Sequence, residues 1–335
     1  MMTQTVSLIS PDPTYPRLVG DIGGTNARFA MIPAAGAAMT AIQTLACADY
    51  PGPAEAITAY LKAARLPSPR WCAFGIANPV SGDLVRMTNH HWQFSISALR
   101  DALGLDVLRV VNDFTALAMA IPALGPADLR QVGGGAIRAG AAIGLIGPGT
   151  GLGISGLIPC QNDYTPLAGE GGHITLAARN REEAALIDWV GNRHGHVSAE
   201  RLISGQGLEN LYLAHAALAG HSVEPLSAAR ISEQALRSTD ALCLRALNSL
   251  CAFLGTVTAN LALILGAQGG MYIGGGIIPK LGPFFDRSPF RARFEDKGRF
   301  QGYLGQIPTF VIQARHPALI GAARALARQA QGGDA

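Results

Sequence analysis

Two glycine-rich segments of this chain carry the residue types that could bind phosphate groups. The first contains Asp21, Gly23, Gly24, Thr25 and Asn26. Its glycines let backbone N–H groups approach an anion without interference from a Cβ atom. Asp21 is a carboxylate that could hold a hydrated Mg²⁺ beside phosphates. An ordinary hairpin turn is the rival interpretation, and this segment alone does not decide between the two.

The second segment, residues 147–153, contains Thr150 and Gly151 and follows an apolar run, which again indicates a loop facing phosphate. Residues 151–156 match the pattern G-x-G-x-x-G. The dinucleotide-binding motif requires a helix to follow, whereas residues 154–159 have the pattern of a strand closed by proline. The sequence contains no GxxxxGK[ST], so it is not a P-loop nucleoside triphosphatase.

Asn112 and Asp113 stand where an expected strand ends and an expected helix begins. A carboxylate at the C-terminal end of a strand is well placed for a ligand. Sugar hydroxyls are weak nucleophiles until a base takes their proton, and phosphoryl transfer otherwise needs mainly positioning and charge neutralisation. The alternative is that Asp113 only caps the helix.

Glu170, His173 and Glu200 could hydrogen-bond sugar hydroxyls from a polar, glycine-containing region. Metal binding is the rival interpretation, but Glu170 and His173 have no clear third ligand. Gly275 and Gly276 follow a short apolar run and could leave a flat surface for an adenine. A tight turn from strand to helix explains these glycines equally well.

The composition indicates a folded protein with a large core. The chain has 335 residues, of which 49% are hydrophobic and 15% charged. A net charge of +3 gives no reason to expect nucleic acid or a membrane as partner. The five cysteines include no CxxC pair, which argues against disulfides or a cysteine zinc site and suits the cytoplasm. The N-terminus does not have the pattern of a secretory signal and is expected to be a short extension.

Residues 246–279 contain no Asp, Glu, Lys or Arg, so a membrane span must be considered. Polar residues interrupt the first half and glycines the second, which favours a buried helix, a turn and a buried strand.

The pattern of apolar runs predicts the elements that position these residues. Strands are expected at residues 18–22, 27–32, 41–47, 71–77, 107–111, 141–146, 154–159, 271–273 and 309–313. Helices are expected at residues 53–66, 95–103, 114–124, 182–194, 198–203, 207–218 and 318–329, with residues 232–265 as one long helix or two adjoining ones. A strand, a glycine turn and a second strand occur twice, which predicts two related α/β lobes.

Together the motifs resemble the bacterial glucokinases outside the ROK group, over about residues 18–328. The resemblance is carried by GDIGGTNARFA, MTNHHWQFSI, VVNDFTALAMAIP, GPGTGLG, GEGGH, GHVSAERLISGQGL, IGGGIIPK and FEDKGRF. It implies the two-lobe, actin-like ATPase (ribonuclease H-like) α/β fold, with the ligand cleft between the lobes. The expected small domain is residues 1–123, completed by the C-terminal helix at 315–335, and the large domain is residues 124–314.

The implied activity is ATP-dependent phosphorylation of D-glucose to glucose 6-phosphate, the first step of glycolysis. The resemblance makes Asp113 the catalytic base. It makes Asn112, Asp113, Glu170, His173 and Glu200 glucose-binding residues, and Asp21, Gly23, Gly24, Thr25, Asn26, Thr150, Gly151, Gly275 and Gly276 ATP-binding residues. Mg²⁺ would arrive with ATP, with no direct protein ligand and a water-mediated contact to Asp21.

The resemblance also implies a cytoplasmic homodimer whose partners are glucose and ATP, not nucleic acid or a membrane. The chain departs from the family at Pro148, where Ala is usual, because proline removes a backbone donor from the second phosphate loop. The ROK cysteine-rich zinc motif is absent. Two alternatives stay open: a kinase for another hexose or amino sugar, and a non-catalytic sugar-sensing regulator.

Overall fold

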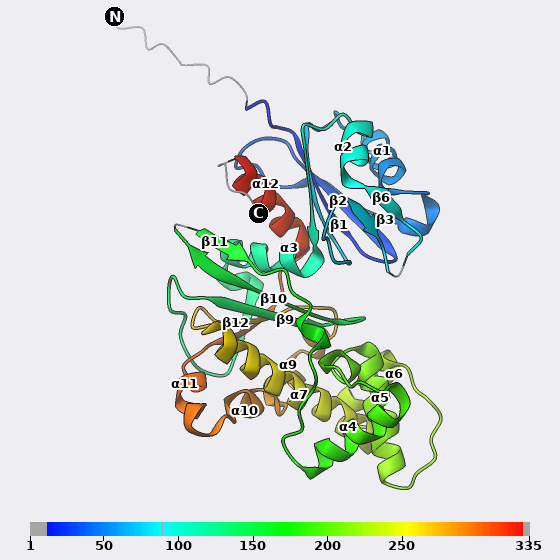
Figure 1. Ribbon diagram of the computed structural model, residues 1–335, viewed down its shortest axis with the longest axis vertical. Coiled ribbons are helices and arrows are strands. Elements are labelled where there is room, and N and C mark those ends of the chain that lie inside the picture. Colours follow the sequence, from blue (N-terminus) through cyan, green and yellow to red (C-terminus); the bar gives the residue numbers. More distant parts are fainter. Residues whose placement is uncertain (1–11, 89, 162, 331–335) are drawn as a thin grey trace, which may run out of the picture. The chain divides into compact units, whose positions relative to one another are not determined.

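Alternating strands and helices build two α/β units, which are described separately (Figure 1). The small unit comprises Met1–Ala123 and His316–Ala335, and the large unit comprises Leu124–Arg315. The computed structural model describes residues 12–88, 90–161 and 163–330. The N-terminal extension up to residue 11, Asn89 and the last five residues of the expected C-terminal helix lie outside the described residues.

A five-stranded sheet forms the centre of the small unit, in the order β3-β2-β1-β4-β7. Its strands are β1 (Arg17–Ile22), β2 (Asn26–Ile32), β3 (Thr40–Ala46), β4 (Trp71–Ile76) and β7 (Val107–Asn112). The glycine turn makes β1 and β2 an antiparallel hairpin, whereas β1, β4 and β7 are parallel. A separate ribbon pairs β5 (Leu84–Arg86) with β6 (Gln93–Ser95).

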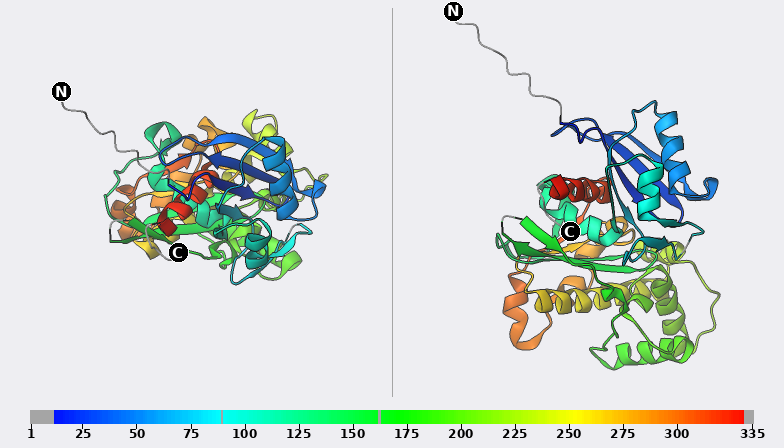
Figure 2. Two further views of the ribbon diagram at one scale, coloured as in Figure 1. Left: turned by 90° about the horizontal axis from the view of Figure 1, so that it is seen from above. Right: turned by 45° about the horizontal axis from the view of Figure 1, so that its top comes forward.

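Helices cover both faces of this sheet (Figure 2). Successive residues of a strand point to opposite faces, and here the residues that point to either face are apolar, so each face needs a cover. On one face lie α1 (Pro53–Ala63) and α2 (Ile96–Ala102), and on the other α3 (Asp113–Ala120) and α12 (Pro317–Ala330). α12 packs so closely on α3 that a Cβ atom on Gly321 would overlap the carbonyl oxygen of Ala116. Residues distant in sequence therefore complete one core.

The large unit has a six-stranded sheet in the order β11-β10-β9-β12-β13-β8. Its strands are β8 (Leu129–Val132), β9 (Ile143–Pro148), β10 (Leu152–Cys160), β11 (Asp163–Pro166), β12 (Met271–Ile273) and β13 (Thr309–Ile312). β9 and β10 form the second antiparallel glycine hairpin, and β12 runs parallel to β9. Since β10 runs through the G-x-G-x-x-G match and beyond it, the prediction that a strand and not a dinucleotide-binding helix stands there is confirmed.

The helices of the large unit pack around the long helix α7 (Ala241–Leu265). The others are α4 (Arg181–His194), α5 (Gly205–Leu218), α6 (Ala228–Leu236), α8 (Ile278–Leu281), α9 (Pro283–Arg287), α10 (Phe290–Glu295) and α11 (Gln301–Gly305). By length and composition α7 could cross a membrane, but 61% of its most apolar window is buried in the protein. The interpretation as a core helix followed by a strand, β12, is confirmed.

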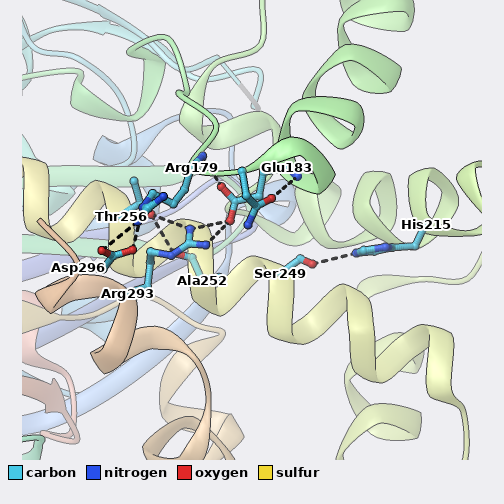
Figure 3. Close-up of polar contacts among 9 residues, drawn as sticks. Arg179, Glu183, His215, Ser249, Ala252, Thr256, Arg293 and Asp296 are labelled. Carbon is cyan, nitrogen blue, oxygen red and sulfur yellow. Dashed lines mark hydrogen bonds and ion pairs between the residues drawn. The ribbon is translucent and has the colours of Figure 1, made fainter. Parts of the chain in front are cut away.

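A polar network ties α4, α7 and α10 together inside the large unit (Figure 3). The Arg293 guanidinium donates to Glu183 Oε1 at 2.5 Å and to Thr256 Oγ1 at 3.2 Å, while the Arg179 N–H donates to the other Glu183 oxygen at 2.7 Å. Removing one partner of such a buried ion pair typically costs about 3–5 kcal/mol.

A second polar contact in the large unit joins α5 to α7. His215 Nε2 lies 2.8 Å from Ser249 Oγ, and burial lowers the pKa of this histidine. A neutral imidazole therefore joins α5 to α7.

All the expected strands are present to within a few residues, and so are the longer helices. One expectation is wrong: residues 198–203 form only a single 3₁₀ turn, η5 (Ala199–Arg201), because Leu202 N–H and Ile203 N–H both return to the carbonyl of Ala199. Residues 232–265 form two helices, since Asp240 caps a new helix by accepting from the N–H groups of Leu242 and Cys243.

Candidate active site

The C-terminal ends of the parallel strands bring two carboxylates to one edge of the small unit's sheet. Ile22 of β1, Ile76 of β4 and Asn112 of β7 lie side by side in register. Asp21 precedes the first of these residues and Asp113 follows the last, so both stand at the same edge. Because neighbouring strands are about 4.8 Å apart, β1 and β7 are separated by about 10 Å.

Asn112, rather than Asp113, is the N-cap of α3. Asn112 Oδ1 accepts hydrogen bonds from the N–H groups of Phe114 and Thr115, at 2.9 and 3.1 Å. Asp113 is the first residue of the helix, and its Oδ1 accepts from Phe114 N–H at 2.9 Å and from Asn112 Nδ2 at 3.0 Å. The N-cap position expected as the alternative role of Asp113 is therefore filled by Asn112, while Asp113 accepts one further bond from Phe114 N–H.

The environment of Asp113 makes its carboxylate a stronger base than a usual one. Burial raises the pKa of Asp113 to about 6, with a smaller contribution from the negative charge of Asp21. The hydrogen bonds from Phe114 and Asn112 act in the opposite direction and keep the pKa from rising further. A carboxylate that titrates near neutral pH suits general base catalysis, because it is ionised at pH 7 yet accepts a proton readily.

Asp21 is held by a residue that sequence reasoning did not single out. Burial raises the pKa of Asp21, and the positive charges of Arg28 and His316 oppose that rise. Arg28 Nη1 lies 3.3 Å from Asp21 Oδ2. The two residues are directly opposite each other in the β1–β2 hairpin, so counting outward from the glycine turn could have revealed the pair.

Gly75 is a second residue that the sequence did not mark. A Cβ atom at Gly75 would lie 3.0 Å from Ala116 Cβ and 3.4 Å from Asp113 Cα. The absence of a side chain there lets the first turn of α3 approach β4 and fixes where Asp113 begins.

The β1–β2 turn offers unused backbone donors. Gly23 N–H closes the turn on the carbonyl of Asn26 at 2.9 Å. Within the part of the chain that the structure describes, the N–H groups of Gly24 and Thr25 donate to no acceptor. Thr25 is also exposed. Free N–H groups in a glycine turn form the kind of concavity that binds anions.

The β9–β10 turn of the large unit has the same property. Gly149 N–H bonds to the carbonyl of Gly151 at 2.8 Å, while the N–H groups of Thr150 and Gly151 donate to nothing among the described residues. Pro148 is the last residue of β9 and lies opposite Leu152. The donors that remain are therefore in the turn itself, beyond the proline.

The predicted sugar-binding residues of the large unit gather around the start of β10. Glu200 Oε2 accepts from the N–H of Leu152 at 2.9 Å. A Cβ atom on Gly172 would overlap the carbonyl oxygen of Leu152, so the turn η4 (Gly171–His173) presses on the same residue. Glu170 and His173 flank that glycine and are exposed.

The glycine segment after β12 lies next to the second phosphate turn. Ile277 N–H donates to the carbonyl of Pro148 at 3.2 Å, and Gly149 approaches the backbone nitrogen of Gly276. Gly275 has φ +78° and a Cβ atom there would overlap the Pro148 oxygen, so only glycine fits. In each unit, the structure thus brings together the site residues which that unit contains. Asn112 and Asp113 belong to the small unit, whereas Glu170, His173 and Glu200 belong to the large one.

Comparison with known proteins gives the family. The glucokinase family model matches residues 18–329. The chain belongs to the glucokinase family. A glucokinase from Aromatoleum aromaticum is 57% identical over 314 residues, which cover 93% of this chain and 95% of that protein. The predicted resemblance to bacterial glucokinases is confirmed.

Solved structures of the glucokinase family share the fold. A crystal structure of a glucokinase from an Antarctic psychrotroph matches with a TM-score of 0.86 and 37% identity, covering 93% of this chain and 99% of that chain. A ROK family glucokinase from Streptomyces griseus, solved with glucose and AMPPNP, is 20% identical over 94% of this chain and 99% of that chain, with a TM-score of 0.62. The predicted actin-like α/β fold class is confirmed.

Metal binding by Glu170 and His173 gains no support from the described residues. In residues 12–88, 90–161 and 163–330 no group of three His, Cys, Asp or Glu side chains is placed to hold a metal ion.

Proposed function

We propose that this chain transfers the terminal phosphoryl group of ATP to the 6-hydroxyl of D-glucose, giving ADP and glucose 6-phosphate. Membership of the glucokinase family over residues 18–329 supports this reaction. The observation that carries the mechanism is the carboxylate of Asp113, at a strand end, with its pKa raised to about 6.

Asp113 acts as the general base in this proposal. As the glucose O6 attacks the γ-phosphorus, a bond forms between O6 and phosphorus and the bond to the β–γ bridging oxygen breaks. The proton of the 6-hydroxyl passes to the Asp113 carboxylate, and the leaving ADP keeps the bond's electron pair. Because Asn112 Nδ2 and Phe114 N–H both hold Asp113 Oδ1, the other oxygen, Oδ2, is the one we assign to the proton.

Glucose is held through its hydroxyls by Asn112, Glu170, His173 and Glu200. Asn112 Oδ1 is already occupied by two helix N–H groups, so its contribution to the sugar must come from Nδ2. Glu200 uses Oε2 for the N–H of Leu152, which leaves Oε1 for a sugar hydroxyl.

The phosphates of ATP are bound by the two glycine turns. The free N–H groups of Gly24, Thr25, Thr150 and Gly151 are suited to phosphate oxygens. The segment 275–276 lies by the second turn and receives the adenosine. Mg²⁺ comes with ATP and neutralises phosphate charge, with a water-mediated contact to Asp21 as the protein's share. Asp21 suits this role because its charge is only partly balanced by Arg28.

We further assign the chain to the cytoplasm and to a homodimer, on the family resemblance alone. All five cysteines are free thiols, and all but Cys160 are buried, which is compatible with a reducing compartment.

The test is ADP release from ATP-Mg²⁺ by the purified protein, with glucose, mannose, fructose, glucosamine and a no-sugar control. Turnover is expected with glucose and is expected to fall by about 10²–10⁴ in Asp113→Asn. Asp83→Asn, an exposed carboxylate of the same unit, is the matched control and should keep turnover. Release with another sugar only would identify a different sugar kinase, and glucose binding without ADP release would identify a sensor. Normal turnover in Asp113→Asn would remove the proposed base.

A further inference from the structure

The small unit contains a pocket at the end of its sheet opposite to Asp113. Its volume is about 430 Å³, within the range of pockets that hold small organic ligands. It lies where β1, β4 and β7 begin: Leu18 is the second residue of β1, Pro69 precedes β4 and Leu105 precedes β7. Asp113 follows the opposite end of the six-residue strand β7, about 20 Å along the strand.

The lining of this pocket combines aliphatic side chains with two cations. The apolar lining residues are Leu18, Ile57, Leu61, Leu66, Pro69, Ala102, Leu103 and Leu105. The two charged lining residues are Lys62 and Arg65, both exposed, and Thr58 and Ser68 add hydroxyls. The lining includes no carboxylate.

Neither cation is neutralised by the protein as described. Among residues 12–88, 90–161 and 163–330, no ion pair or side-chain hydrogen bond involves Lys62 or Arg65. The nearby acidic residues are already occupied, because Asp101 pairs with Arg100 at 2.7 Å and Asp106 with Arg70 at 2.6 Å. Two unpaired positive charges therefore line a pocket that also exposes aliphatic side chains.

The backbone at Arg65 provides an independent reason to assign a role to this side chain. Helix α1 ends in a Schellman motif, in which Leu66 N–H bonds to the carbonyl of Leu61 at 3.0 Å and Arg65 N–H to that of Lys62 at 3.2 Å. Arg65 fills the left-handed position of this motif, with φ +53°. Glycine is the usual residue there, because a side chain incurs a steric cost at positive φ. The arginine at this position lines the pocket with a guanidinium.

We propose that this pocket binds a small amphiphilic anion, with an aliphatic body on the leucines and a carboxylate or phosphate group between Lys62 and Arg65. The anion chemistry follows from the two cations without a lining carboxylate, and the aliphatic body follows from the partly exposed side chains of Leu61, Leu66 and Leu103. The inference concerns a second site and does not depend on the reaction proposed above.

Titration calorimetry with octanoate tests the proposal, with octyl phosphate to separate the two anionic head groups. Octanol lacks the charge and acetate lacks the aliphatic body, so both should bind at least tenfold more weakly than octanoate. Lys62→Gln and Arg65→Gln should each weaken octanoate binding about threefold and the double variant about tenfold. Arg86→Gln, an exposed arginine of the same unit outside the pocket, is the matched control and should bind octanoate normally.

Arg65→Gly and Arg65→Lys separate a ligand role from a structural one. Arg65→Gly relieves the left-handed backbone, so its melting temperature should equal or exceed that of the wild type while octanoate binding weakens. Arg65→Lys should retain most of the binding. Equal affinities for octanol and octanoate, unchanged binding in the double variant, or no octanoate binding at all would each overturn the proposal.

Competition experiments locate the ligand. Octanoate should bind equally in the presence of saturating glucose and ATP-Mg²⁺, and displacement by either would place it elsewhere and refute the assignment. Sedimentation covers one more outcome: self-association that Leu61→Ser or Leu103→Ser abolishes would show that a second copy of the chain occupies the pocket instead.

Discussion

Replacing Asp113 by Asn should make the protein more stable while it inactivates the enzyme. Burial and the charge of Asp21 raise the pKa of Asp113 from 3.8 to about 6. A pKa change of this size corresponds to about 3 kcal/mol. At pH 7 the ionised Asp113 carboxylate therefore lowers the free energy of unfolding of the wild type by about this amount. Asparagine carries no charge and keeps an Oδ1 that can accept from Phe114 N–H, so Asp113→Asn removes that cost.

The pH dependence of the stability difference between wild type and Asp113→Asn shows whether the charge of Asp113 causes it. Below about pH 4, Asp113 is protonated in both the folded and the unfolded state, so wild type and variant should be equally stable. Between about pH 4 and 6 the unfolded state loses its proton first, and the wild type loses stability relative to the variant. Above about pH 6 both states of the wild type are ionised, and the variant should keep a constant advantage of about 3 kcal/mol.

Urea unfolding of the ligand-free protein from pH 4.5 to 7.5 measures this difference. Trp71 and Trp92 lie in the small unit and Trp189 in the large one, so a Trp189→Phe background lets tryptophan emission follow the small unit alone. Asp83→Asn is the control of opposite sign, because hydrogen bonds from Ser95 and Ser97 lower the pKa of Asp83. A variant less stable than wild type at pH 7, or a gain that does not change with pH, would refute the reasoning.

Three other changes test the site and the packing around it. As the pH is lowered, kcat/KM should begin to fall near pH 6 in the wild type and at a lower pH in Asp21→Asn, because the charge of Asp21 raises the pKa of Asp113. A pH–rate profile of each protein measures the two midpoints. In Gly151→Ala, the new Cβ would overlap Glu200 Oε2 and lie 3.3 Å from Glu200 Cδ, so the Glu200 side chain must shift and lose its hydrogen bond from Leu152 N–H. The kcat/KM for glucose should then fall about 10–100-fold. Gly321→Ala should lower the free energy of unfolding by about 3 kcal/mol or more, because its Cβ would overlap the carbonyl of Ala116; thermal and urea unfolding would show it.

The sequence predicted the long elements of this fold because their signals are local. Apolar runs ending in glycine marked both hairpins, and the helix expected from residue 95 begins there as α2, capped by Ser95, which accepts from Ala98 N–H. The four short helices between residues 278 and 305 were missed. Prolines at 279, 283 and 289 interrupt their periodicity, and each helix is held by tertiary packing of a few side chains such as Phe290 and Phe294.

The site was predicted as a set of segments but not as a geometry. Asp113 could be found from its place after an apolar strand, yet the sequence could not decide between a base and a cap. That choice depends on which of two adjacent side chains caps the α3 N–H groups: Asn112 accepts from both Phe114 and Thr115, whereas Asp113 shares only that of Phe114. Gly75 and Gly172 were not recognised, because the reason for each glycine is a close approach by a residue far away in sequence.

Within the large unit, Glu200 connects the proposed glucose-binding residues with the second phosphate turn. One of its oxygens holds the backbone of Leu152, directly after the phosphate turn, and Gly151 lacks the side chain that would displace it. If the other oxygen takes a glucose hydroxyl, a movement of Glu200 on sugar binding that keeps this bond also moves Leu152, which is adjacent to the N–H groups of the turn. The sugar could thereby adjust the donors offered to the phosphates, and this is the physical reason to expect glucose and ATP to affect each other's binding. Glu200→Gln keeps an oxygen for Leu152 N–H but loses the charge, so it should weaken glucose binding while preserving the turn. Loss of ATP binding in the absence of sugar would contradict this division of roles.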